Sequence, residues 1–116
     1  MRRILIGDRQ SSKVTSPRII KLTMVIGLLS VELHLPYSHS LKEKRMVLRR
    51  IKDRLQKMNI AIAEVEHHDL WQRAGLGIVA ISTTTEHVEE QLRAAADEID
   101  RVEPGVMIRT EIEFLT

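Results

Sequence analysis

The chain has 116 residues, of which 43% are hydrophobic and 29% are charged, and its formal net charge is +2. This length suits one domain, and the composition is typical of a soluble globular protein. Because the chain has no cysteine, disulfides, zinc ribbons and thiol nucleophiles are excluded, and a cytoplasmic location is expected. With only one Trp, one Tyr and one Phe, the chain cannot supply a base-stacking platform of several aromatic side chains.

Residues 1–23 carry six basic residues and one acidic residue, without a consistent hydrophobic period. Their apolar runs are far shorter than a signal-peptide core or a membrane span, so no membrane partner is expected. We interpret them as an N-terminal extension that is disordered or not native, and a transit peptide is the less favoured alternative. The folded domain is expected to comprise residues 24–116, beginning at Met24.

The first part of this domain predicts a strand and then a helix. Val25–Leu33 is almost wholly apolar, which indicates a central strand buried on both faces. Ser40 and Glu43 have the spacing of a capping box, in which each side chain bonds the other residue's backbone amide. A stripe of residues at steps of three and four then predicts a helix over 41–57 that faces a core. The stripe comprises Leu41, Lys44, Leu48, Ile51, Leu55 and Met58, with Val47 beside it.

The second part repeats this pattern with two strands before the helix. Residues 60–66 alternate as in a half-exposed strand, with Glu64 and Glu66 on the same side. Residues 67–73 form a connector too long for a tight hairpin, and 76–82 predict a third strand that is apolar on both faces. A second helix follows, capped by one of three threonines and stopped by Pro104-Gly105. Alternation over 106–115 predicts the last strand.

The order strand, helix, strand, strand, helix, strand predicts an α+β protein with a ferredoxin-like sandwich. In this fold a four-stranded antiparallel sheet carries both helices on one face. The two long apolar strands are expected in the centre of the sheet, and the other two at its edges.

Four stretches of the chain resemble one known family. They are Val25–Leu33, Tyr37–Arg45 (YSHSLKEKR), Ala63–Arg73 (AEVEHHDLWQR) and Arg109–Phe114 (RTEIEF). Together they are similar to the YlxP-like proteins, small bacterial proteins catalogued as a domain of unknown function. The resemblance covers residues 24–116 and implies a ferredoxin-like fold. It also implies a role near RNA or ribosomes, because the genes of this family often lie near those for translation initiation and ribosome maturation factors. It implies no catalytic residue and no cofactor.

Charge is divided between the two predicted helices. Residues 42–57 hold eight Lys and Arg against two acidic residues, whereas residues 86–103 hold seven acidic residues against two Arg. Four of the cations step by three, four and three along one side of the first helix, and a phosphate backbone could contact them in succession. This predicted nucleic-acid-binding row comprises Lys42, Arg45, Arg49 and Lys52. As an alternative, the row is only solvated, or it pairs with acids of the second helix such as Glu89, Glu90 or Glu98.

The connector contains His67-His68-Asp69, which suggests a metal site. Neighbouring side chains in a strand point to opposite faces, so both histidines bind one ion only if the backbone leaves the strand. The spacing also matches no zinc motif, and no metal site is predicted. In a structural interpretation, Trp71 closes the edge of the core while Arg73 or Asp69 holds the connector.

Several carboxylates could suggest paired acid–base catalysis. The edge strands lie about 14 Å apart, whereas a glycosidase-type pair needs roughly 5–9.5 Å. Glu32 with Glu111 or Glu113 remains possible, but a line of acids on the helix-free face of the sheet is the favoured interpretation. The acids in question are Glu32, Glu64, Glu66, Glu111 and Glu113.

These observations favour a non-enzymatic binding protein that contacts RNA or the ribosome through its basic helix and needs no cofactor. Two alternatives remain open. One is a homo-oligomeric or protein–protein interaction module, such as a homodimer, which exposed edge strands would favour. The other is a small metal-dependent enzyme built around His67, His68 and Asp69.

Overall fold

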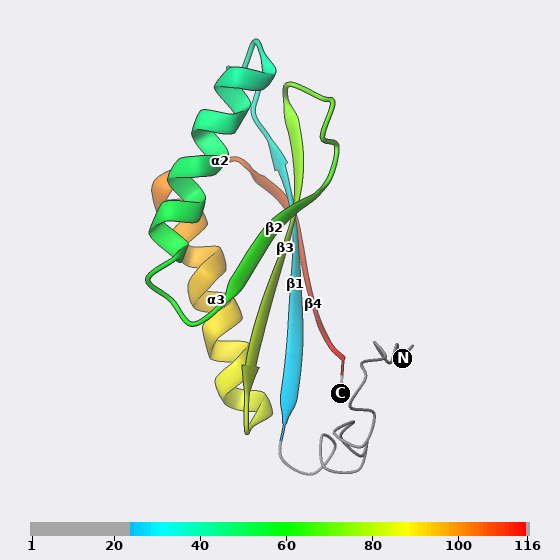
Figure 1. Ribbon diagram of the computed structural model, residues 1–116, viewed down its shortest axis with the longest axis vertical. Helices are drawn as coiled ribbons and strands as arrows, with labels where there is room; N and C mark the ends of the chain where they lie inside the picture. The colour runs from blue at the N-terminus through cyan, green and yellow to red at the C-terminus, as the bar shows by residue number, and fades with distance from the viewer. Residues whose placement is uncertain (1–23, 116) are drawn as a thin grey trace, which may run out of the picture.

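The sheet and its two helices form two layers in the computed structural model, which describes residues 24–115 (Figure 1). The interpretation of residues 1–23 lies outside this range. The strands are antiparallel and stand in the order β2-β3-β1-β4, with both helices on one face. The predicted ferredoxin-like α+β fold is therefore confirmed. The elements are β1 (Val25–His34), α2 (Leu41–Leu55), β2 (Ala61–Glu66), β3 (Arg73–Ser82), α3 (Thr85–Val102) and β4 (Met107–Phe114).

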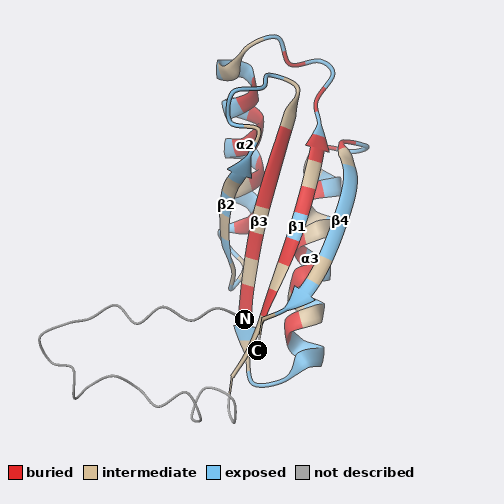
Figure 2. Cartoon of the chain, turned by 90° about the vertical axis from the view of Figure 1, so that its right-hand side faces the viewer, coloured by how far each residue is buried: buried red, intermediate tan, exposed pale blue. Residues whose placement is uncertain are grey.

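The core lies between the helices and the facing side of the central strands. The other side of β1 and β3 holds mostly intermediate or exposed residues, so the predicted burial on both faces is wrong for the open face. Figure 2 shows buried residues concentrated along β1 and β3, whereas the edge strands β2 and β4 are largely exposed. The alternate residues Leu29, Val31 and Leu33 of β1 are at most 2% exposed. The helix α3 packs so closely on β1 that a Cβ atom on Gly27 would lie 2.5 Å from Val88 Cγ1. Glycine is therefore required at this contact.

Both helices begin at predicted caps. Ser40 Oγ accepts a hydrogen bond from the Glu43 amide at 3.0 Å, and the carboxylate of Glu43 accepts one from the His39 amide at 2.9 Å. The return bond of the capping box thus reaches one residue further back than predicted. At α3, Thr84 Oγ1 accepts a hydrogen bond from the His87 amide at 3.1 Å. Each cap satisfies an amide that the first turn leaves without a partner.

Two details of β2 and β3 differ from the prediction. β3 begins at Arg73 rather than Leu76, because Arg73 pairs with His34 at the end of β1. The register between β2 and β3 shifts between Glu64 and Glu66. Glu64, in register with the buried Leu76, lies on the helix side of the sheet, and the shift places Glu66 against Gly75 on the open face. The predicted placement of Glu64 on the helix-free face is wrong, because strict alternation puts Glu64 on the same side as Ile62, and the bulge moves only Glu66 to the open face.

Candidate nucleic-acid interface

The predicted row of cations lies on the outer face of α2. The side chains of Val47, Leu48, Ile51 and Leu55 are buried on the opposite side of the helix. Lys42, Arg45 and Arg49 are exposed and Lys52 is half-buried. Within residues 24–115, none of these four side chains forms a salt bridge or a hydrogen bond. We call Lys42, Arg45, Arg49 and Lys52 the basic row.

The acidic helix α3 pairs with other cations of α2. Arg54 Nε donates to Glu98 Oε1 at 3.2 Å, and Arg50 forms an ion pair with Glu103. Glu89 pairs within its own helix, accepting from Arg93 at 2.8 Å. The alternative in which the basic row pairs with acids of α3 is therefore wrong for the described residues. The acidic helix α3 neutralises cations on the side of α2 that faces it, and the basic row on the outer face of α2 stays positive.

Tyr37 adds a neutral donor to the same contact between the helices. Its hydroxyl donates to the carboxylate of Glu103 at 2.7 Å. Burial of the hydroxyl, together with this carboxylate, raises the pKa of Tyr37 to about 12. The hydroxyl therefore stays protonated at neutral pH, and Glu103 is shared between Tyr37 and Arg50.

Lys44 belongs to the basic segment by sequence but not to its surface. It is 1% exposed, and its Nζ atom donates to Glu64 Oε2 at 2.9 Å. The same atom lies 2.8 Å from the carbonyl oxygen of His67, 3.3 Å from that of His68 and 3.2 Å from that of Arg73. An ammonium has three protons, so at least two of these four acceptors share one. Lys44 thus fixes the connector between β2 and β3 against the first turn of α2.

The two histidines of the connector face different partners. The backbone at His67 has φ of 63°, and its Nε2 atom lies 3.1 Å from Glu32 Oε1. His68 Nε2 lies 3.1 Å from the carbonyl oxygen of Glu64. In the described part of the chain, no group of three or more His, Asp and Glu side chains could hold a metal ion. The alternative of a metal-dependent enzyme therefore finds no ligand set there.

Glu32 links His67 to Arg73 on the open face of the sheet. Its carboxylate accepts a hydrogen bond from Arg73 as well as facing the imidazole of His67. Desolvation acts to raise the pKa of Glu32, but the hydrogen bonds and charges of His67 and Arg73 outweigh it. The net effect is a pKa below the ordinary value. Arg73 therefore holds the end of the connector, which is one of the roles predicted for it.

This lowered pKa makes a pH-dependent prediction for a Glu32→Gln variant. A depressed carboxyl pKa contributes stability that is present above the pKa of the unfolded chain, about 4.3, and is lost as pH falls through the native value. Wild type should therefore exceed the variant in unfolding free energy at pH 7, and the difference should shrink towards pH 3. Urea unfolding at both pH values measures this, and an unchanged difference would contradict it.

The open face of the sheet contains a hollow of about 490 Å³ beside this cluster. Gly75 and Ser30 contribute to its lining, together with His67 and the charged residues Glu32, Glu66, Arg73, Arg109 and Glu111. The predicted line of acids on this face is thus correct for Glu32, Glu66 and Glu111, and Glu113 pairs in register with Leu28 on the same face. Exposed apolar side chains also occur here, including Val65 at 55% and Ile81 at 46%. Homo-oligomerisation through this face stays a prediction.

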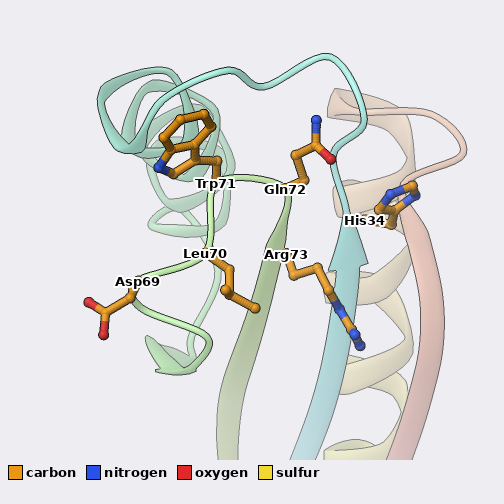
Figure 3. A pocket seen from close by; sticks show the side chains of 6 residues that line it. All are labelled: His34, Asp69, Leu70, Trp71, Gln72 and Arg73. Carbon is orange, nitrogen blue, oxygen red and sulfur yellow. The ribbon is translucent and has the colours of Figure 1, made fainter.

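Trp71 is exposed, which sequence reasoning missed. It is 54% exposed and Leu70 is 45% exposed, so Trp71 does not close the edge of the core as predicted. Figure 3 shows Trp71 projecting from the connector, where it borders a hollow of about 430 Å³ with His34, Asp69, Leu70, Gln72 and Arg73. The core at this end is closed instead by Leu35, which is 0% exposed and whose amide donates to the Gln72 carbonyl at 2.8 Å.

None of the helices among residues 24–115 combines the length and the apolar character that a membrane crossing requires.

Comparison with known proteins agrees with the resemblance noted above. A family model described as "Protein of unknown function (DUF503)" matches residues 26–112. "Uncharacterized protein YlxP" of Bacillus subtilis (strain 168) is 40% identical over 77 residues, which cover 66% of this chain and 84% of that protein.

Two solved structures resemble the fold. "De novo designed protein Foldit4" has a TM-score of 0.51 at 10% identity and covers 80% of this chain and 97% of its own. The C-terminal segment of the alpha subunit of aIF2 from Pyrococcus abyssi has a TM-score of 0.47 at 23% identity, covering 80% of this chain and 50% of that one. The design supports the fold alone. Because the family model spans most of the sequence, the protein belongs to the DUF503 family.

Proposed function

We propose that this protein is a non-enzymatic binding protein that associates with RNA, free or in the ribosome, through the basic row of α2. The supporting observation is that the four cations of the row face solvent without partners among the described residues. This holds although an acidic helix lies beside α2 and pairs with Arg50 and Arg54. Pairing with α3 therefore leaves a one-sided positive surface on α2.

The spacing within the row suits a polyanion. Arg45 and Arg49 are four residues apart, and Arg49 and Lys52 are three apart, so each pair repels across one turn of the helix. A phosphate backbone along this face would replace the repulsion with attraction and would release its condensed counterions. Since the row reaches phosphates and not base edges, binding through the row alone is expected to depend little on sequence.

The salt dependence of RNA binding tests this proposal. A labelled structured RNA should bind with a dissociation constant of about 10⁻⁴ to 10⁻⁶ M at physiological salt. With up to four phosphate contacts, a plot of log K against log salt should have a slope of about −2 to −4. Fluorescence anisotropy between about 50 and 200 mM salt measures this slope. A flat plot, or no binding even at the lowest salt, would overturn the proposal.

A further inference from the structure

We infer that the nucleic acid held by the basic row is single-stranded and that Trp71 stacks on one of its bases. This inference rests on the proposed function and adds a class of ligand to it. Trp71 is the only tryptophan of the chain and is 54% exposed, although tryptophan is highly buried in most folded proteins. Single-strand-binding surfaces combine exposed aromatic side chains with cations, and the end of the molecule that carries Trp71 is also the end where the basic row begins.

The connector brings Trp71 to the end of the molecule where the basic row begins. On one side of Trp71, the carbonyl of His67 accepts a hydrogen bond from Lys44 in the first turn of α2 at 2.8 Å. On the other side, Gln72 Nε2 donates to the carbonyl oxygens of Pro36 at 3.0 Å and Ser38 at 3.2 Å, just before α2. Trp71 is therefore tied to the segment that leads into Lys42 and Arg45.

These anchors also hold the backbone on both sides of Trp71. The Lys44 ammonium contacts the carbonyl of Arg73 as well as that of His67, and Arg73 in turn pairs with Glu32. A side chain presented by a fixed backbone loses little conformational freedom when a ligand stacks on it. The entropy cost that opposes the favourable stacking energy is therefore smaller. The indole is therefore a preorganised surface and not the tip of an untethered loop.

The hollow beside Trp71 gives a base or its ribose a place to lie. Its volume is about 430 Å³, and Leu70, Arg73 and His34 contribute to its lining (Figure 3). Arg73 and Leu70 thus bring a charged and an apolar side chain to the same hollow as the exposed indole. The bases of a duplex are stacked on one another, so only an unpaired base offers its face to Trp71.

The intrinsic fluorescence of Trp71 tests this inference directly, because the chain has no second tryptophan. The full chain is titrated, at each salt concentration of the series described above, with a short single-stranded RNA, an abasic oligomer of equal length and an RNA duplex. The single strand should quench the fluorescence, and the other two should leave it nearly unchanged. Base stacking should also strengthen binding of the single strand over the abasic oligomer by about 5- to 150-fold.

Variants separate stacking from charge. Trp71→Ala should bind the single strand as weakly as wild type binds the abasic oligomer, with an unchanged salt slope, and Trp71→Phe should recover much of the loss. Ile108→Ala is the matched control, because Ile108 is also 54% exposed but lies on the opposite edge strand β4. This control should bind the single strand as wild type does.

The outcomes distinguish this inference from the proposed function. Salt-dependent binding of all three oligomers with equal affinity and unchanged fluorescence would overturn stacking but leave the basic row in its role. Absence of salt-dependent binding to any oligomer would overturn both. If Trp71→Ala leaves RNA binding intact but abolishes association with another protein, the exposed indole is a protein contact and the inference is wrong.

Discussion

A Lys44→Met variant is expected to have an unfolding free energy about 3–5 kcal/mol below that of wild type. The substitution keeps much of the apolar volume but removes the ammonium that pairs with Glu64 inside the fold. The side chain of Glu64 is only 16% exposed, so its charge would be left largely buried without a counterion. The carbonyls of His67 and Arg73 would lose a donor in the same step.

Urea unfolding measures this loss, and Lys42→Met is the matched control. Lys42 precedes Lys44 by two residues on the same helix but is exposed and unpaired, so its substitution should change the unfolding free energy by less than about 0.5 kcal/mol. A double variant, Lys44→Met with Glu64→Gln, should recover part of the loss because no buried charge remains. Equal effects of Lys44→Met and Lys42→Met would show that Lys44 is not a structural ion.

The Lys44 substitution also connects stability to the candidate interface. The connector that carries Trp71 would lose its anchor to α2, while the bonds of Gln72 to the preceding segment would remain. Amide exchange should therefore accelerate at residues 67–70 more than at the core strands, because local opening becomes easier than global unfolding.

The hydrophobic pattern was sufficient to predict the fold, because each element carries its own periodicity. The stripe of α2 and the apolar central strands favour an arrangement in which both helices cover one face of the sheet. The same pattern placed Lys44 among the core positions of α2, which was the signal that this lysine is internal. Its partner could not be inferred, because the approach of Glu64 depends on how β2 pairs with β3 beneath α2, which only the tertiary structure shows.

The connector and the start of β3 were less predictable for a related reason. Arg73 and the residues after it have weak strand propensity, and they extend β3 only because the end of β1 offers partners across the sheet. The exposure of Trp71 follows from that pairing and from the position of Leu35, which fills the core at this end. From sequence, an aromatic residue is usually assigned to the core. Only the tertiary structure shows that Leu35 already fills the core beside Trp71.

The charge pattern shows both what sequence can and what it cannot reveal. The helical spacing correctly placed all four cations of the basic row on one face. It could not show which cations the acidic helix would neutralise, because that depends on which side of α2 faces α3. Arg50 and Arg54 lie on that side and form the ion pairs. The net positive surface is therefore smaller than the count of basic residues in α2, and it is restricted to the outer face.

Reversing two charges of this face, in an Arg45→Glu/Arg49→Glu variant, is expected to weaken RNA binding by at least about tenfold near 100 mM salt. Each substitution removes a phosphate contact and adds a repulsion, so the slope of log K against log salt should fall in magnitude by about two. The unfolding free energy should change little, because neither arginine has a partner in the described residues. Anisotropy titrations and urea unfolding on the same preparations measure both quantities.

A second double variant separates the position of the charges from their number. Arg93→Glu/Arg101→Glu changes the net charge by the same amount, but both arginines are exposed on α3 and pair within that helix, Arg93 with Glu89 and Arg101 with the mostly buried Glu98, which keeps Arg54 as a partner. Such pairs contribute about 0–1 kcal/mol, so the fold should persist, and RNA binding should stay close to that of wild type. Equal weakening in the two variants would mean that RNA responds to the total charge of the protein, and a specific role for the outer face of α2 would then be rejected.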